Sequence, residues 1–203
     1  MDAISLLKQD HRKVDALFRQ FERTRPARVG GTGRQHNADG QKKDLLEKII
    51  RELSVHTAIE EQVFYPLVRK GAPDTTENVL VALEQHHVAK WELDELEGMD
   101  PDEDRFEAKV LVLIDNVRHH VEEEEEALFP QVQAGLTRQQ LDEIGNRLAQ
   151  ARESVPTRPH PRMPDEPPGN VVAGPAAAVV DRAYERGKET VEQIREQVGR
   201  SAD

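Results

Sequence analysis

The chain has 203 residues, of which 33% are charged, 36% hydrophobic and only 4% aromatic, and its formal net charge is −11. So few aromatic residues do not suit a β-sandwich and favour a helical protein with a small aliphatic core. The negative charge argues against non-specific binding to nucleic acid or to anionic membranes. The absence of cysteine excludes disulfides, iron–sulfur clusters and zinc–thiolate sites.

The N-terminal sequence lacks the basic and apolar segments of a signal peptide. No apolar run reaches the length of about 18 residues that a transmembrane helix needs. We therefore expect a cytoplasmic protein that does not contact membranes.

Apolar residues recur at helical spacing over residues 2–24, 41–70, 76–98 and 102–131, with short or moderate connections between these segments. The stretch from Pro26 to Gly40 is rich in glycine and is expected to be a flexible loop, in which His36 faces solvent. Thr75 or Thr76 is expected to cap the third helix. These features predict an all-α protein built as an up-down-up-down four-helix bundle.

Beyond the bundle, Thr137 and Gln140 have the spacing of a capping box, which predicts a short fifth helix over 138–153. Residues 154–175 hold seven of the twelve prolines and are expected to form an extended linker between the bundle, 1–153, and an amphipathic C-terminal helix in 176–203. The apolar seam of this helix fits three roles, namely docking onto the chain's own bundle, contact with a second copy or another protein, or a mobile tail. Its members are Val180, Tyr184, Gly187, Val191, Ile194 and Val198.

The most informative pattern occurs twice. His56 to Pro66 and His120 to Pro130 both read His-x-x-x-Glu-Glu-x-x, followed by two bulky apolar residues and a proline. A single His-x-x-x-Glu is usually a surface pair, and most of the acidic run 122–126 is expected to be solvated. The repeat, however, places a histidine and a glutamate four apart on the apolar face of two different helices.

Two carboxylates buried side by side would be costly without a counter-charge, and a pair of metal cations removes that cost. Each long helix offers a histidine to such a centre. Helical phase favours His86 over His87, and the register of the repeat favours His120 over His119, although a local π-bulge could bring His119 to the same place. The candidate ligands are therefore His11, His56, Glu60, His86, His120 and Glu124. Nitrogen and oxygen ligands without sulfur suit non-haem iron first, with manganese or zinc as alternatives.

As a set, these residues resemble the hemerythrin-like, HHE cation-binding family over about residues 1–150, and the added linker and helix look like its actinobacterial branch. The resemblance implies a bundle holding two non-haem iron ions with an oxo or hydroxo bridge. It implies that Glu60 and Glu124 bridge the irons and that His11, His56, His86 and His120 are terminal ligands. Members of the family bind dioxygen, sense oxygen or iron, or react with peroxide and nitric oxide.

One position departs from the oxygen-carrying members, which have two histidines four apart on the third helix. Here His86 is followed four residues later by Lys90. A protonated lysine does not ligate, so one metal is expected to keep an open position where small molecules react.

We therefore predict a di-iron protein that binds or reacts with O2, H2O2 or NO, including a peroxide-decomposing activity, inside walls formed by Leu7, Val14, Leu53, Val63 and Leu83. The alternative is an iron- or oxygen-sensing module that acts through the C-terminal helix. A ferritin-like carboxylate protein fits less well, because its Glu-x-x-His spacing occurs here only from Glu84 to His87.

Overall fold

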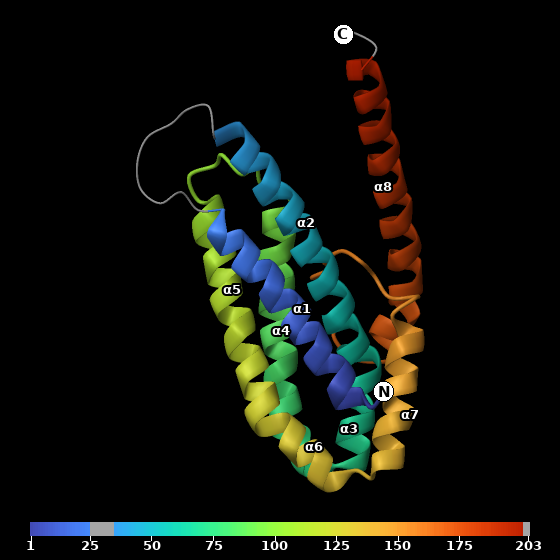
Figure 1. The fold of residues 1–203 in the computed structure, drawn as a ribbon. Coiled ribbons are helices and arrows are strands. Elements are labelled where there is room, and N and C mark those ends of the chain that lie inside the picture. The colour runs from blue at the N-terminus through green and yellow to red at the C-terminus, as the bar shows by residue number, and fades with distance from the viewer. Residues whose placement is uncertain (25–34, 201–203) are drawn as a thin grey trace.

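The computed structural model describes residues 1–24 and 35–200, and these are helical with connecting turns and no strand (Figure 1). The long helices α1 (Ala3–Arg23), α2 (Gln35–Ile59), α4 (Thr76–Glu97) and α5 (Phe106–Glu123) form the bundle. Their direction alternates along the chain, with α1 packed against α2, α2 against α4, and α5 against both α4 and α1. The all-α, up-down-up-down fold predicted from the sequence is confirmed.

Two of these helices, α2 and α5, continue beyond a π-helical turn. The turn Glu60–Phe64 joins α2 to α3 (Tyr65–Gly71), and the turn Glu124–Leu128 joins α5 to α6 (Phe129–Gly135). A 3-10 turn, Pro73–Thr75, leads into α4. Thr75 stands at the N-cap position of α4, but its hydroxyl donates to the carbonyl of Ala72 at 2.7 Å, so the expected capping bond to the helix is not made.

The second helix begins at Gln35 rather than at residue 41, so the expectation of a loop is wrong for residues 35–40, which are helical. The remainder of the expected loop, with Gly30 to Gly33, lies outside the described residues, as does the side chain of His36. The helix 106–123 likewise begins four residues later than the sequence pattern suggests, after a turn that follows Pro101.

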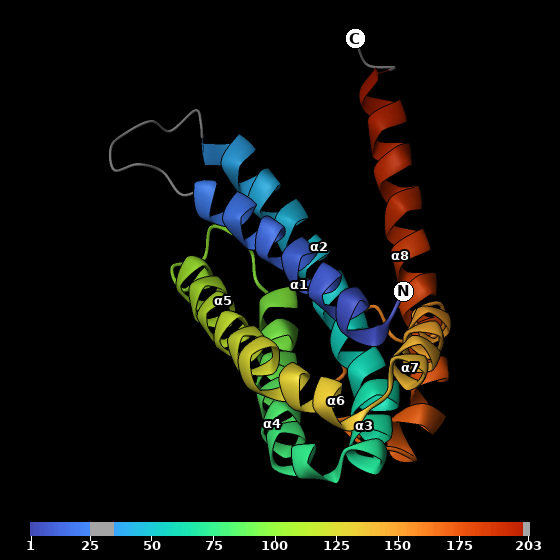
Figure 2. The ribbon, with the colours of Figure 1, turned by 60° about the horizontal axis from the view of Figure 1, so that its bottom comes forward.

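Two further helices lie against the bundle, α7 (Arg138–Ala151) and α8 (Gly169–Arg200) (Figure 2). The predicted capping box of α7 is present, because Thr137 Oγ1 accepts the Gln140 backbone N–H and Gln140 Oε1 accepts the Thr137 N–H. Close contact between α7 and the start of α1 requires a glycine: a Cβ on Gly145 would lie 2.3 Å from the Met1 carbonyl oxygen. This contact sets the position of α1.

Helix α8 begins at Gly169, earlier than residue 176, and carries Pro175 inside it. The segment before it is fastened to α8, since buried Asp181 accepts the backbone N–H groups of Thr157 and Arg158 at 2.9 and 3.1 Å. Of the predicted apolar seam, Val180 and Tyr184 are 65% and 57% exposed. The side chains of the other apolar seam residues, at positions 191, 194 and 198, are outside the part of the chain that the structure describes.

Buried apolar residues form two clusters rather than one. One cluster gathers around α3, α6 and α7, and the other fills the opposite half of the bundle around Phe18, Phe21 and Phe106. A buried polar layer separates them: His11, for example, lies between Leu7 of the first cluster and Val14 of the second. No helix in the described part of the chain is long and apolar enough to span a bilayer.

Candidate metal centre

The two π turns begin at the two buried glutamates. In each, the residue before the proline donates its N–H to the glutamate carbonyl five positions earlier, Tyr65 to Glu60 and Phe129 to Glu124. A proline has no N–H and its ring collides with the carbonyl four residues before it, so an α-turn is disfavoured there. The wider turn removes this conflict. The prolines repeated in the sequence thus explain why both copies of the motif have the same local shape.

The structure brings all six predicted residues together in the polar layer. One group contains His11, His56, Glu60 and Glu124, with one potential ligand atom of each within 4.8 Å of the others. His11 Nε2 lies 3.3 Å from Glu124 Oε2, and His56 Nε2 lies 3.2 Å from Glu60 Oε2. These four side chains come from α1, the end of α2 and the two π turns.

A second group contains Glu60, His86 and His120, under the same distance limit. His86 Nε2 lies 3.4 Å from Glu60 Oε2 and 3.1 Å from His120 Nε2, which in turn lies 3.6 Å from Glu124 Oε2. Because Glu60 belongs to both groups, the two clusters share a carboxylate. This arrangement can hold a metal ion.

The imidazoles direct Nε2 inward, and the Nδ1 atoms lie beside outer acceptors. Nδ1 of His11 is 2.8 Å from Glu125, that of His86 is 3.3 Å from Glu61, and that of His120 is 2.8 Å from Gln85. For His56, Nδ1 lies 3.6 Å from Asp10, which also pairs with Arg152 of α7. An Nδ1–H donated to such an acceptor fixes the ring and leaves the Nε2 lone pair free, which is the usual pattern around metal-binding histidines.

Several of the inner atoms, by contrast, have no hydrogen-bond partner. Within the described residues, the buried side-chain atoms without a hydrogen bond include His11 Nε2, His56 Nε2, Glu124 Oε2 and both carboxylate oxygens of Glu60. Buried polar atoms are nearly always satisfied, and unsatisfied ones that converge on one point indicate a missing counter-ion. The donor set therefore fits metal cations.

The electrostatics lead to the same conclusion. Burial and the charge of Glu124 raise the pKa of Glu60 well above its usual range. Burial also raises the pKa of Glu124, but the imidazoles of His120 and His11 outweigh it and hold that pKa below the usual range. Burial lowers the pKa of His86 and of His120 to about 3, so both rings are neutral and able to ligate at neutral pH.

The alternative histidines lie outside these groups. His87 is 41% exposed at its side chain and contacts Asp165, with 3.0 Å between Nδ1 and Oδ2. His119 is 66% exposed and lies 3.4 Å from Glu123. The helical phase and the repeat register therefore separated the buried from the exposed member of each pair. The acidic run behaves as expected too, since its residues at 122, 123 and 126 are exposed while Glu124 is buried.

Tyr65 is a buried member of the site that the sequence analysis did not identify. Its hydroxyl donates to Glu124 Oε1 at 2.8 Å and lies 3.3 Å from His86 Nε2. Burial and the nearby carboxylates raise the pKa of Tyr65 well above 10, so the phenol stays protonated. A sign was available in the repeat, because Tyr65 corresponds to Phe129 and only the first copy carries a hydroxyl.

Lys90 also has a place that the sequence did not reveal. Its ammonium group lies 2.9 and 3.0 Å from the two oxygens of Glu61, whose Oε1 contacts His86 Nδ1, and it also pairs with Asp165. Burial raises the pKa of Glu61 to about 7, although Lys90 partly opposes this shift. Lys90 thus supports the outer side of His86 instead of ligating.

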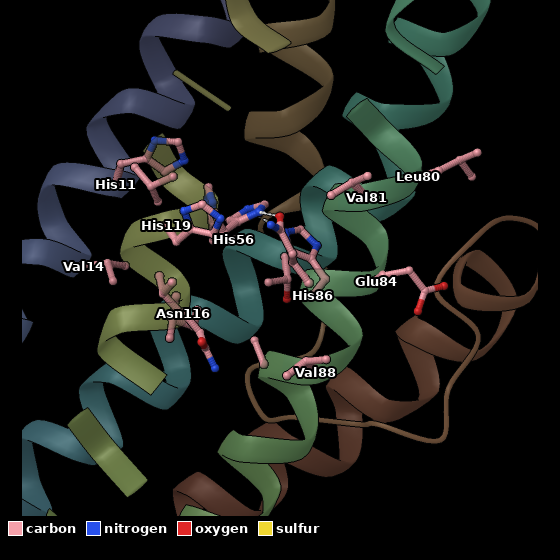
Figure 3. A pocket seen from close by; sticks show the side chains of 17 residues that line it. His11, Val14, His56, Leu80, Val81, Glu84, His86, Val88, Asn116 and His119 are labelled. Carbon is pink, nitrogen blue, oxygen red and sulfur yellow. Dashed lines mark hydrogen bonds between the residues drawn. The ribbon is translucent and has the colours of Figure 1, made fainter. Parts of the chain in front are cut away.

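A pocket of about 530 Å³ opens on the centre between α4 and α5 (Figure 3). Its walls include all four histidines of the site, so the imidazoles form its inner end. Of the predicted apolar walls, Val14 and Leu53 line it, whereas the other three do not and belong to the surrounding core: Leu7, Val63 and Leu83. The walls that sequence reasoning missed are contributed mainly by the exposed side of α4, where no apolar residue was expected to matter.

The chain matches the family described as hemerythrin HHE cation binding domain over residues 2–132. It is 27% identical over 161 residues to a DNA nickase of Nostoc sp., a match that covers 78% of this chain but only 41% of the nickase. It is 26% identical over 136 residues to an uncharacterized hemerythrin-like protein of Schizosaccharomyces pombe, covering 66% of this chain and 67% of that protein.

Among solved structures, the crystal structure of a hemerythrin HHE cation binding domain-containing protein from Mycobacterium kansasii matches with a TM-score of 0.58 and 23% identity. The match covers 75% of this chain and 86% of that one, and at this identity it shows a shared fold. The family match extends over more than half of the chain and includes every residue of the two groups. The chain belongs to the hemerythrin HHE cation binding domain family.

Proposed function

We propose that this protein holds two non-haem iron ions and binds or reacts with a small oxidant, O2, H2O2 or NO. The observation that carries the proposal is the pair of buried groups joined by Glu60. His11 and His56 would hold one ion and His86 and His120 the other, with Glu60 and Glu124 between them. The nitrogen and oxygen donors, without sulfur, favour iron over zinc and leave manganese as the next alternative.

Bound iron would supply the electrons and the Lewis acidity that small oxidants require. The chain's own residues contribute the surroundings. The outer acceptors keep the imidazoles oriented, and the Tyr65 hydroxyl donates a hydrogen bond to Glu124. The apolar pocket walls limit water around the centre. Since Lys90 is engaged with Glu61 and does not ligate, the His86 side is short of one protein ligand compared with oxygen carriers. This favours reaction with the oxidant over reversible storage.

The direct test is metal analysis and optical spectroscopy of protein produced with ample iron, followed by addition of H2O2 and measurement of O2 release. We expect about two irons per chain, near-ultraviolet absorption from the bridged centre, and turnover above that of free iron. Glu123→Gln should leave the iron content unchanged, because Glu123 lies next to Glu124 in the motif but is exposed. A folded protein that takes up no iron would refute the proposal, and iron without peroxide turnover would restrict the function to binding or sensing.

A second candidate function, sensing of iron or oxygen through the C-terminal helix, is supported by a chain of contacts. Asp165, in the segment leading to α8, pairs with Lys90, which holds Glu61, which contacts His86. The buried side chain of Asn170, in the first turn of α8, donates to the Asp165 carbonyl at 3.0 Å. The position of α8 is therefore linked to a proposed ligand, and its exposed Val180 and Tyr184 offer a surface for a protein partner or a second copy.

Hydrogen exchange distinguishes this candidate. Removing the metal should speed amide exchange over residues 165–181 in the unmodified protein, and Asp165→Asn should abolish the metal dependence. The neighbouring Glu166→Gln is the control, because Glu166 pairs with Arg69 on the surface and not with Lys90. If amide exchange in this segment is the same with and without metal, the sensing function is refuted.

The relative named DNA nickase raises the question of nucleic acid. The net charge of −11 supports the prediction that this chain does not bind it non-specifically. A mobility shift of duplex DNA at low salt would contradict that prediction.

A further inference from the structure

The pocket is much larger than an oxidant needs. Dioxygen, peroxide and nitric oxide have two non-hydrogen atoms each, whereas the pocket holds about 530 Å³. This volume lies within the range of roughly 300–1,000 Å³ that is typical of sites for organic ligands. The excess space lies along α4 and α5, beyond the imidazoles.

The walls of this space are formed mainly by apolar side chains. Val14, Val117 and Val121 line it from α1 and α5, and Ala89 lines it from α4. At its outer part, Val81 and Val88 are 47% and 50% exposed, although they stand on the solvent side of α4. Figure 3 shows Val88 directed towards Asn116 across the gap between the two helices.

Besides the four histidines of the site, the polar residues that line the pocket are Thr57, Glu84, Gln85, Asn116 and His119. The histidine Nε2 atoms mark the inner end, and Glu84 lies at the outer edge, directed away from the imidazoles (Figure 3). Among the described residues that line the pocket, none is a lysine or an arginine. An anionic ligand would therefore meet no lysine or arginine in the lining before the metal centre, in a protein that is already strongly negative.

We propose that this pocket binds an uncharged, apolar organic molecule about the size of two or three fused or linked rings, with one end against the imidazoles. The ligand would be anchored by the valine walls and held apart from water. This binding does not require the proposed iron chemistry, but it would place the molecule where a reaction at the centre can reach it.

A pair of fluorescent probes tests the proposal on the full-length protein. N-phenyl-1-naphthylamine is neutral, and 1-anilinonaphthalene-8-sulfonate has the same ring system with an added sulfonate. We expect saturable binding of the neutral probe at one per chain and at least tenfold weaker binding of the sulfonate. Val88→Trp narrows the pocket and should weaken binding of the neutral probe at least fivefold. Val81→Trp should have the same effect.

Val112→Trp is the matched control, because Val112 is 53% exposed on α5 but does not line this pocket. Three results would overturn the proposal: no saturable binding of the neutral probe, equal affinity for the sulfonate, or equal loss in the Val88 and Val112 variants. Iron content and peroxide turnover are measured on the same preparations. A protein that loads iron and fails the probe test refutes the pocket assignment alone, and one that binds the probe without iron refutes the proposed function alone.

Discussion

Glu60 and Glu124 come from two separate π turns, yet ligand atoms of both lie within 4.8 Å of each other in a group of buried side chains. Neither is more than 2% exposed. The basic residues near them are imidazoles, of which His86 and His120 are neutral at physiological pH. Two such carboxylates repel each other, and this repulsion makes the metal-free protein and the metal-loaded protein respond differently to the same substitutions.

Glu60→Gln should abolish metal loading and also stabilise the metal-free protein. Because burial and Glu124 raise the pKa of Glu60, its carboxyl group lowers the free energy of unfolding as pH rises above the unfolded value near 4.5. The amide has no charge, so we expect a gain on the order of 1–3 kcal/mol at pH 7 that disappears below about pH 4. Urea unfolding of chelator-treated protein at both pH values measures it.

Glu123→Gln serves as the control for that experiment, since its side chain is 46% exposed. It should load metal normally and change the unfolding free energy very little. Equal metal content in the Glu60 and Glu123 variants would contradict the assignment of Glu60.

Tyr65→Phe should destabilise the metal-free protein while leaving its helices intact. The substitution removes the hydrogen bond to Glu124 and leaves a buried carboxylate oxygen without its donor. A hydrogen bond to a charged group contributes about 1.5–3 kcal/mol, which sets the expected loss. Tyr184→Phe is the comparison, because Tyr184 is 57% exposed, and an equal loss in both variants would mean that the hydroxyl of Tyr65 has no special role.

Lys90→Met should be strongly destabilising, by about 3–5 kcal/mol, because it leaves Glu61 buried without its cation. Adding Glu61→Gln removes the stranded charge and should restore a large part of the loss. A double-mutant cycle of urea unfolding, with both single variants, measures this coupling. Additive effects would show that the two side chains do not act as a pair.

Glu22→Gln tests the contact between α1 and α5, where the Arg118 guanidinium donates to both oxygens of Glu22, at 2.7 and 3.1 Å. This bonding lowers the pKa of Glu22. The stabilisation that this ion pair provides is therefore present above pH 4.5, the pKa of Glu22 in the unfolded chain. It is lost as the pH falls through the lower pKa that Glu22 has in the folded protein. Because the pair is partly exposed to solvent, the variant should lose less than about 1 kcal/mol at pH 7, and less still at about pH 3, in urea titrations. A loss of the same size at both pH values would exclude the ion pair as its cause.

The bundle and the gathering of the six candidate ligands in one buried layer could be predicted because both follow from helical periodicity. On α4, for instance, His86 shares the face of Leu83 and Leu93, and all three are buried. Such a pattern depends on one helix at a time, so a single sequence contains it. The same reasoning distinguishes His86 from His87 without any knowledge of the neighbouring helices.

The remaining features depend on contacts between helices that are distant in sequence. The pairing of Lys90 with both Glu61 and Asp165 needs the relative position of three segments, and no local pattern specifies it. Helix α8 begins at Gly169 and includes Pro175, although a proline inside a helix is locally unfavourable, so the local pattern placed its start too late. The role of Tyr65 follows from a π turn, whose geometry was considered only for the second copy of the motif.

Each π turn accommodates one residue more than an α-helical turn would over the same rise. The flanking stretches, up to Ile59 and from Tyr65 onward, are ordinary α-helix. Removing one amino acid between Glu61 and Phe64, together with replacement of Pro66, would therefore let the helix continue as α-helix while both ends keep the faces that they now present. At this point the backbone can take up a change of one residue in chain length without turning the flanking helices to other faces.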